Sequence, residues 1–397
     1  MIYNLYQVLE QWLNDHHLGF FRVFDTISFR AVMAIVLSFL FVMVTARPTI
    51  RWLVRQKIGD HPEFHHEDLN EIMKQKARTP TMGGVMISGA ILVSTLLLAD
   101  LRSFYVIMAL LCLVWLSGLG AIDDWLKLTS QRRNPGSREG LKFWEKLVCQ
   151  VALAVLLGIF IHHHGVNKFT FPQQEIRDMS HSLTMPFAKS WRFDPETQRY
   201  VSVVFVLGTF SFVTLSVIVI TGASNAVNLT DGMDGLASGI TAVCAFAFMV
   251  LAYIAGIEAH AQYLLVPYIP LSGELAIVAG GMLGSCLGFL WFNCSPAQVF
   301  MGDTGSLPLG GLLGYVAVVV RQEFLLLLIG GVFVMEAVSV MIQVGYFRLS
   351  GGRRIFKCAP VHHHFHLIGW TEQQVVVRLW LLSAMFAAMA LATLKLR

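Results

Sequence analysis

The chain has 397 residues, of which 55% are hydrophobic and only 14% are charged, and its mean hydropathy is +0.63. Soluble domains carry about 25% charged residues, so this composition excludes an ordinary soluble protein and indicates an integral membrane protein. The net charge of +4 is small and no nucleic-acid-binding pattern is found, so no nucleic acid is expected among its partners.

Ten apolar stretches have lengths near the ~20 residues that cross a bilayer. They predict an all-α integral membrane protein of about ten transmembrane helices, which form a single polytopic domain, residues 1–397. The N-terminus has no basic region followed by an apolar core and a cleavage site, so we expect no removable signal peptide. In chain order the predicted spans are 31–46, 82–99, 104–122, 147–161, 201–221, 236–256, 273–291, 307–320, 324–347 and 373–394.

Basic residues between the spans predict the orientation in the membrane. The connecting segments 47–80, 123–146 and 348–372 carry 7, 6 and 4 Lys or Arg, and the positive-inside rule places them in the cytoplasm. Both termini and a long loop insertion, 162–200, then fall on the outer side. All six cysteines lie in spans or cytoplasmic segments, so no disulfide framework is expected.

The first polar cytoplasmic segment ends in "KQKARTPTMGGVM" at the membrane edge. Lys76, Thr81 and the glycine pair that follows offer a cation, a hydroxyl and close backbone approach to a phosphate. A positively charged flank followed by a turn explains the same residues, and both interpretations stay open at this point.

The second segment places Asp123 and Asp124 at the end of an apolar span. Adjacent carboxylates on a helix point about 100° apart, so one can face a site while the other faces a neighbour or a metal-bound water. Lys127 follows Asp123 by four residues, so an ordinary helix ion pair is the alternative.

The third segment, "NAVNLTDGMDGLASG" at 225–239, is rich in acids, amides and glycines. Asn228, Asp231 and Asp234 are spaced by three and would share one face if the segment is helical. Glycine-mediated helix packing explains the glycines. It does not explain the aspartates, so we expect a ligand here.

The fourth segment, "WFNCSPAQVFMGDTGS", contains Asn293, Phe300 and Asp303. An aspartate flanked by glycines and hydroxyls suits a hard cation such as Mg²⁺, which takes one or two carboxylates and completes its shell with water and substrate phosphate. The alternative is that Asp303 caps the helix that follows it.

The fifth segment, "PVHHHFH", contains His362, His363 and His364 beside several basic residues. No cysteine or carboxylate lies at zinc-finger spacing, so donors to a phosphorylated ligand are favoured over a zinc site. A second histidine triplet, 162–164, lies on the predicted outer side, and we expect it to have no role in catalysis. The five polar segments share the cytoplasmic face, and their chemistry fits metal-assisted phosphoryl transfer on a membrane-embedded substrate.

The motifs "TPTMGG", "DDWLK", "NAVNLTDGMDGLA", "FLWFNCSPAQVFMGDTGS" and "PVHHHFH", in this order, resemble the bacterial phospho-N-acetylmuramoyl-pentapeptide-transferase family. This family is part of the polyprenyl-phosphate N-acetylhexosamine-1-phosphate transferase superfamily, and the resemblance runs from about residue 22 to the C-terminus. It implies transfer of phospho-MurNAc-pentapeptide from UDP-MurNAc-pentapeptide to undecaprenyl phosphate, which gives lipid I and UMP in peptidoglycan biosynthesis. It also implies Mg²⁺ dependence, a multi-pass location in the bacterial cytoplasmic (inner) membrane and a homodimer.

The resemblance also assigns roles to residues of this sequence. Asp123 and Asp124 resemble the family's paired active-site carboxylates. Asp303, the third implied catalytic residue, resembles the family's magnesium ligand. The preferred mechanism is direct attack by the lipid phosphate with Asp123 assisting deprotonation, because a magnesium-bound Asp303 is a poor nucleophile for a two-step route. The implied substrate-binding residues are Lys76, Thr81, Lys127, Lys146, Asn228, Asp231, Asp234, Asn293, Phe300, His362, His363 and His364.

Two other functions remain open. A related transferase that uses UDP-N-acetylglucosamine or a similar sugar shares the aspartate motifs, although "APVHHHFHLIGW" and "TPTMGG" favour the muramoyl-pentapeptide branch. A membrane transporter would need charged residues along a pathway through the bilayer. Only Glu336 lies near the middle of a predicted span, with Arg378 nearer an end, so the polar groups do not form such a pathway.

Overall fold

The computed structural model describes residues 1–55, 79–133, 140–167, 181–185, 191–195, 199–202 and 205–395. Helices dominate these residues, and no sheet contributes to the core of the described part. The strands form two short antiparallel pairs: β1 Ser182–Leu183 with β4 Phe205–Val206, and β2 Trp191–Asp194 with β3 Arg199–Ser202.

Eight helices in the described residues are long and apolar enough to cross a membrane. The predicted second and eighth spans are occupied by the shorter apolar helices α4 (Gly84–Leu98) and α11 (Asp303–Val319). The expected all-α membrane protein is therefore confirmed. The eight long helices belong to α2 Ile27–Arg55, α5 Phe104–Arg133, α6 Phe143–Asn167, α7 Thr209–Thr230, α8 Leu236–Ala255, α10 Leu275–Asn293, α13 Gly331–Leu349 and α15 Glu372–Ala392.

Several helices differ from the predicted spans. The segment expected at 324–347 is divided at Gly330 into α12 (Glu323–Ile329) and α13, since consecutive glycines weaken a helix. The span expected from 201 starts only at Thr209, after β3 and β4. Helix α5 continues well beyond 122, because hydrophobicity predicts where a helix is apolar and not where it ends.

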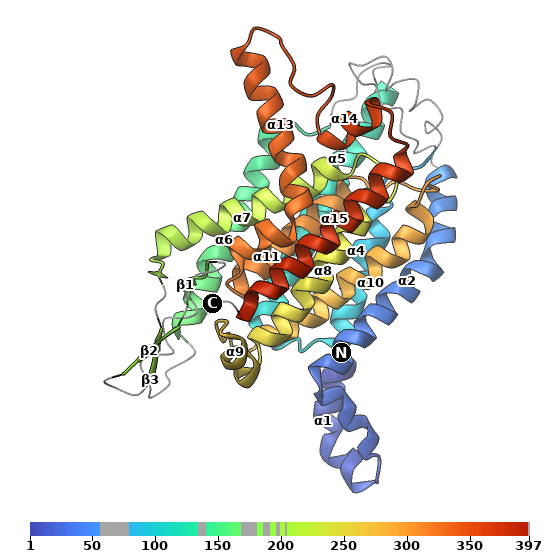
Figure 1. Ribbon diagram of the computed structural model, residues 1–397. Coiled ribbons are helices and arrows are strands. Elements are labelled where there is room, and N and C mark those ends of the chain that lie inside the picture. The colour runs from blue at the N-terminus through green and yellow to red at the C-terminus, as the bar shows by residue number, and fades with distance from the viewer. Residues whose placement is uncertain are drawn as a thin grey trace.

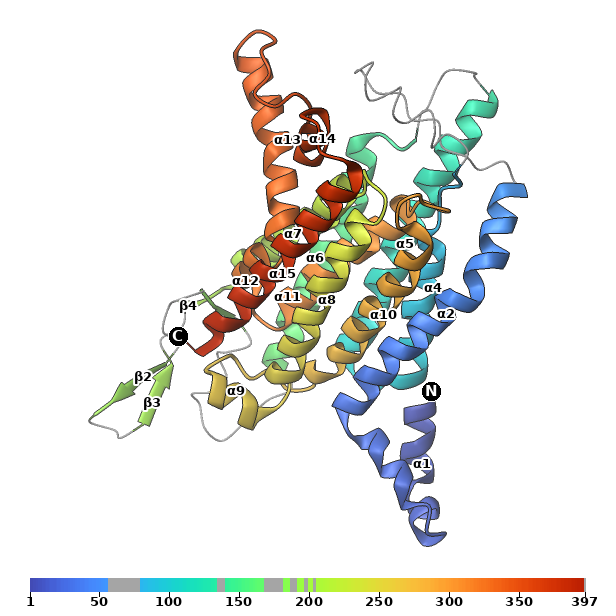
Figure 2. The ribbon, with the colours of Figure 1, turned by 45° about the vertical axis from the view of Figure 1, so that its right-hand side comes forward.

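The helices form one bundle in which both termini lie toward the same end and α14 (Val361–Leu367) lies at the other, as Figures 1 and 2 show. This arrangement agrees with an even number of crossings. Helix α10 packs against α2 and α8, and α11 packs against α5 and α7, so these two helices are the most enclosed. The remaining short helices of the described residues are α1 Ile2–Asp15, η1 Gly19–Asp25, α9 Glu258–Leu264, η4 Ser272–Glu274 and η5 Thr393–Lys395.

A buried ion pair ties the helices together at the end where the N-terminus lies. Arg30 of α2 donates to both carboxylate oxygens of Glu274, at 2.8 and 2.6 Å. The ring of Tyr3 lies 3.7 Å from the guanidinium carbon, and Glu274 also accepts a hydrogen bond from the backbone of Asp100. The pair is far from the polar motifs and therefore has a structural role.

Candidate active site

Three aspartates from two helices meet at one place. Asp123 and Asp124 lie on α5, and Asp303 is the first residue of α11. Each offers a carboxylate oxygen, and these atoms lie within 4.8 Å of one another although about 180 residues separate them in the chain. All three side chains are buried, so their negative charges require nearby cations.

The close contact between α5 and the start of α11 depends on two glycines. A Cβ atom on Gly120 would lie 2.2 Å from the carbonyl oxygen of Asp303. Gly302 has φ +72°, and a Cβ atom there would lie 2.7 Å from Oδ2 of Asp124. Any larger residue at either position would separate the aspartates, so these glycines are part of the site.

Asp124 holds the N-terminus of α11. Its Oδ1 accepts a hydrogen bond from the backbone of Asp303 at 3.2 Å, and its Oδ2 accepts two from Thr304, from the backbone at 3.0 Å and from the hydroxyl at 2.7 Å. The alternative considered from the sequence, in which Asp303 caps its own helix, is wrong. The N-cap residue is Gly302, which offers no side-chain acceptor, and Asp124 of another helix accepts from the backbone N–H groups at the start of α11.

Two lysines bridge the aspartates. Nζ of Lys146 lies 2.7 Å from Oδ2 of Asp123 and 2.6 Å from Oδ2 of Asp303. Nζ of Lys127 lies 2.6 Å from Asp123 and 3.3 Å from Asp303. The helix ion pair considered for Lys127 is thus present, but the same lysine also reaches α11. The backbone of Leu141 donates to the other oxygen of Asp123 at 2.7 Å.

The end of α7 supplies the next wall. The side chain of Asn228 donates to Oδ1 of Asp303 and to Oγ of Ser306, both at 2.8 Å. The helix ends at Thr230, and a turn leads to α8. The shared helical face considered for Asn228, Asp231 and Asp234 therefore does not form, because the glycines after Asp231 end the helix.

Asp231 lies in this turn, close to the acidic cluster. Burial raises the pKa of Asp231 to about 7, and the negative charges of Asp303 and Asp124 contribute to the increase. A hydrogen bond from the backbone of Gly302 opposes it. A carboxyl group with this pKa changes its charge near neutral pH, and a cation or a donor from a ligand would favour its ionised form.

Asp234 and Asn293 connect segments of the wall. Asp234 accepts a hydrogen bond from the backbone of Ala297 at 3.1 Å, and its own backbone donates to Glu372 at 3.0 Å. The amide oxygen of Asn293 accepts from the backbone of Gly235 at 3.0 Å, and its nitrogen donates to the carbonyl of residue 299 at 2.9 Å. Sequence reasoning missed Glu372, whose only signal is an acid in the first turn of the last helix.

The "TPTMGG" segment lies beside the residues that precede α11. Phe300 donates its backbone N–H to Pro80 and accepts one from Gly83, both at 2.8 Å. Thr81 lies next to Gly302, because its hydroxyl would contact a Cβ atom placed on that glycine. Thr81 and Phe300 thus join the aspartates at one site, whereas Lys76 lies outside the described residues and its phosphate contact remains a prediction.

The three histidines of α14 have different surroundings. His362 and His363 are buried with ring centroids 4.2 Å apart, and His362 lies against Gly232, the neighbour of Asp231. His364 is partly exposed, and its Nδ1 accepts a hydrogen bond from the backbone of Lys357 at 3.2 Å. The first two histidines therefore belong to the site, while His364 stabilises the loop that precedes α14.

The acidic cluster suits a divalent cation. Within the described ranges, Asp123, Asp124 and Asp303 are the only group of three or more His, Cys, Asp or Glu residues arranged to hold a metal ion, so a zinc site at the histidines has no support. The ammonium of Lys146 lies between Asp123 and Asp303, and a positive charge is thus already accommodated there. Hard carboxylate oxygens are the protein ligands that Mg²⁺ prefers, and one or two of these three would suffice with water and substrate phosphate.

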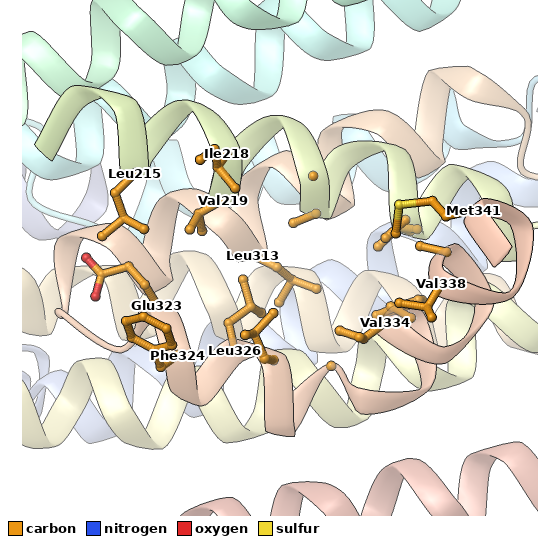
Figure 3. Close-up of a pocket in the computed structure, with 18 residues that line it drawn as sticks. Leu215, Ile218, Val219, Leu313, Glu323, Phe324, Leu326, Val334, Val338 and Met341 are labelled. Atoms are coloured by element: carbon orange, nitrogen blue, oxygen red, sulfur yellow. The ribbon is translucent and has the colours of Figure 1, made fainter. Parts of the chain in front are cut away.

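An apolar groove of about 410 Å³ begins beside this polar cluster. Helices α7, α11, α12 and α13 line it, and Figure 3 shows Glu323 and Phe324 at one end and Met341 at the other. Ala226 and Val227 also line the groove, and the next residue of α7 is Asn228, which donates to Asp303. An apolar chain and a phosphate can therefore be bound within one helical turn of each other.

The glycosyl transferase family 4 model matches residues 106–321. A phospho-N-acetylmuramoyl-pentapeptide-transferase of Thermodesulfovibrio yellowstonii is 42% identical over 393 residues, 99% of this chain and 100% of the relative. The chain belongs to the phospho-N-acetylmuramoyl-pentapeptide-transferase family. Other members are 45% identical in Desulfotalea psychrophila, over 95% of this chain and 96% of the relative, and 42% identical in Nitratidesulfovibrio vulgaris, over 100% of both.

The relatives of this transferase family cover more of the site than the family model does. The matched residues 106–321 include the three aspartates and both lysines but neither Thr81 nor His362. The relatives extend over almost the whole chain, so "TPTMGG" and "PVHHHFH" also lie within the similar region. The resemblance inferred from the five motifs is therefore confirmed.

Proposed function

We propose that this chain transfers phospho-MurNAc-pentapeptide from UDP-MurNAc-pentapeptide to undecaprenyl phosphate, which forms lipid I and releases UMP in peptidoglycan biosynthesis. The names of its relatives, at 41–45% identity over nearly the full chain, support this reaction. The observation that carries it in the structure is the adjacency of an apolar groove and an acid–lysine cluster, since the reaction needs a lipid chain and a pyrophosphate bound side by side.

The groove is the proposed site of the prenyl chain of undecaprenyl phosphate. The residues of α7 that line it, from Leu215 to Val227, are all apolar. Glu323 of α12 is the one charged residue of the lining. Burial of isoprene units there would be driven by contacts of the same kind as those within the bundle. The phosphate at the end of the chain would then lie beside Asn228 and Asp303.

The proposed chemistry is a direct transfer. An oxygen of the lipid phosphate attacks the phosphorus attached to the sugar, the bond from that phosphorus to the bridging oxygen breaks, and UMP leaves with the bonding electrons. Asp123 accepts the proton of the lipid phosphate, while Lys127 and Lys146 bind phosphate oxygens. Asp303 is unsuited as a nucleophile, because it is the proposed ligand of Mg²⁺ and a metal-bound carboxylate is a poor nucleophile.

Mg²⁺ is the proposed cofactor, held by Asp303 with Asp123 and Asp124 close by, and when bound it supplies charge neutralisation for the pyrophosphate. Asp124 would act mainly by holding α11, as both of its oxygens accept hydrogen bonds from the start of that helix. We further propose the bacterial cytoplasmic membrane as the location, with the site on the cytoplasmic face and both termini outside, and a homodimer as the assembly.

The two alternatives are less well supported. A related transferase for UDP-N-acetylhexosamine would use the same aspartates, but the near-full-length relatives carry the muramoyl-pentapeptide name. A transporter would need a polar pathway across the bundle. In the described part of the chain, the mid-helix acid Glu336 is instead bonded to His362 near the polar cluster, and the groove lining is apolar.

The test uses purified protein in detergent with undecaprenyl phosphate and Mg²⁺. UMP release is measured from UDP-MurNAc-pentapeptide and from UDP-N-acetylglucosamine, with chelation and re-addition of Mg²⁺ as one control. Asp303→Asn is the matched variant, and it should keep its elution volume in gel filtration while turnover is lost.

Each outcome decides between the functions. UMP release from UDP-MurNAc-pentapeptide alone, lost on chelation and restored by Mg²⁺, would support lipid I synthesis. Release from UDP-N-acetylglucosamine alone would assign the chain to the sister branch. Release from neither substrate would overturn the transferase function, and near-normal turnover by Asp303→Asn would overturn the site.

A further inference from the structure

A buried acid on α13, Glu336, contacts the first histidine of α14. Oε2 of Glu336 lies 3.0 Å from Nδ1 of His362 and 3.3 Å from the backbone nitrogen of the same residue. Both side chains are completely buried. One turn further along α13, the hydroxyl of Ser339 accepts a hydrogen bond from the backbone of Val361 at 3.0 Å. Glu336 and Ser339 thus attach the start of α14 to α13.

Packing alone does not explain an acid at this position. Glu336 lies among apolar residues in the helix sequence "VFVMEAVSVMI", where a hydrophobic side chain would avoid the cost of burying a carboxylate. Its second oxygen, Oε1, has no hydrogen-bond partner among the residues described here. Within the described part of the chain, His362 is therefore the only hydrogen-bond partner of the Glu336 carboxyl group.

The carboxylate determines which nitrogen of His362 carries a proton. Since Oε2 can only accept, Nδ1 must donate, and in the neutral ring Nε2 is then left with a lone pair. Nε2 is buried and lacks a hydrogen-bond partner within the described residues. Carboxylates that orient an imidazole in this way are common next to functional histidines.

The oriented ring lies against the turn that carries Asp231. A Cβ atom on Gly232 would lie 2.4 Å from Nε2 of His362 and 3.4 Å from Nε2 of His363. The imidazole therefore occupies the space of a side chain at position 232, and any rotation of the ring would move the turn. Asp231, the preceding residue, receives a hydrogen bond from Gly302 beside the aspartate cluster.

We propose that Glu336 is a positioning residue of the nucleotide-sugar site, acting through His362 on the turn formed by Asp231 and Gly232. It does not contact the substrate. It fixes the tautomer and the orientation of His362, and the ring in turn fixes the wall that carries Asp231. The inference rests on the proposed function, because it concerns the binding of the UDP-linked substrate.

Three variants at this position separate the role from simple packing. Glu336→Leu removes the acceptor, and the KM for UDP-MurNAc-pentapeptide should rise by about tenfold with a smaller change in kcat. Glu336→Gln keeps a carbonyl oxygen that accepts from Nδ1, so its KM should stay within about threefold of wild type. The double variant Glu336→Leu/His362→Ala should have the KM of His362→Ala alone, because both substitutions remove the same contact.

Glu274→Gln is the matched control. It also removes the charge of a buried acid, but at the other end of the bundle, where Glu274 pairs with Arg30. Its thermal stability should fall while its KM for the nucleotide substrate stays unchanged. An equal rise in KM for Glu274→Gln and Glu336→Leu would mean that general destabilisation explains the effect, and this would overturn the proposal.

A second readout does not depend on turnover. In protein with ¹⁵N-labelled histidine, the resonances lost in His362→Ala identify this ring, and the wild type should show Nδ1 protonated and Nε2 unprotonated. Glu336→Leu should change this pattern and Glu336→Gln should preserve it. If the wild type releases UMP, but Glu336→Leu has the same KM and the same histidine resonances as wild type, the inference about Glu336 fails while the proposed function stands. If the wild type has no turnover, the proposed function fails, and the resonances still test the contact.

Discussion

Thr304 donates two hydrogen bonds to Asp124, one from its backbone and one from its hydroxyl, and so joins the start of α11 to the middle of the site. Asp124→Asn should lower kcat by about 100-fold, because the amide cannot accept all three bonds and Asp303 moves with the helix end. Thr304→Val removes only the hydroxyl bond and should cost about tenfold. UMP release checks both values, and a larger loss for Thr304→Val than for Asp124→Asn would contradict this role.

Lys146 neutralises two carboxylates, so its removal should make the protein depend on a divalent cation for stability. Lys146→Gln should unfold at a lower temperature than wild type without Mg²⁺, and Mg²⁺ should raise its Tm more than that of wild type. Lys142→Gln, in the same segment, is the control and should respond like wild type. Equal responses of all three proteins to Mg²⁺ would argue against a cation site at the aspartates.

The pKa of Asp231, raised to about 7, predicts a pH-dependent stability. A carboxyl group whose pKa is higher in the folded protein binds its proton more tightly there, so its contribution to stability falls as pH increases from about 4 through 7. Asp231→Asn cannot ionise, and without divalent cations its Tm should exceed that of wild type at pH 8 but not at pH 4. The same variant should turn over poorly, because the proposed nucleotide contact is lost. A Tm difference that is constant with pH would refute the argument.

The groove should determine the affinity for the lipid substrate. Val219→Trp places a large side chain in the middle of the groove and should raise the KM for undecaprenyl phosphate several-fold without changing the KM for UDP-MurNAc-pentapeptide. Thr214→Trp, on an exposed face of the same helix, is the control. A parallel change in both KM values for Val219→Trp would indicate a distorted α7 instead of a filled groove.

The histidine triplet at 162–164 should be dispensable for turnover. His162 lies near His181, and His164 stacks on Phe104 with ring centroids 4.0 Å apart, so both pack at the C-terminal end of α6. Replacement of all three by alanine should lower stability slightly and leave kcat within about twofold of wild type. His362→Ala, measured beside it, should raise the KM for UDP-MurNAc-pentapeptide. A large loss of turnover from the outer triplet would contradict the predicted orientation.

Much of the site follows from residue types that are unusual in an apolar sequence. Asp123, Asp303 and Asn228 stand out in the sequence because acids and amides gather in a few polar segments between apolar spans, all on one predicted face. The meeting of these residues at one site could be expected from the predicted membrane orientation, which puts all five polar segments on the cytoplasmic face. The helical bundle was equally predictable, because its signal is the length of the apolar stretches.

The roles of individual groups could not be predicted in the same way. That Asp124 holds α11 depends on the packing of two helices that are distant in the chain, and local spacing carries no information about it. In the sequence Glu336 is an isolated mid-span acid, and only the position of α14 shows its contact with His362. The break at Gly330 was also missed, because the hydrophobic pattern continues through it.

The junction of the groove with the polar cluster at Val227 and Asn228 has a kinetic consequence. One substrate reaches this point by diffusion in three dimensions through water, and the other by diffusion in the two dimensions of the membrane. The concentration that governs the rate is therefore moles per litre for the nucleotide but mole fraction in the bilayer or micelle for the prenyl phosphate. Addition of inert detergent or lipid at a constant amount of undecaprenyl phosphate dilutes only the second substrate and slows only its encounter with the enzyme.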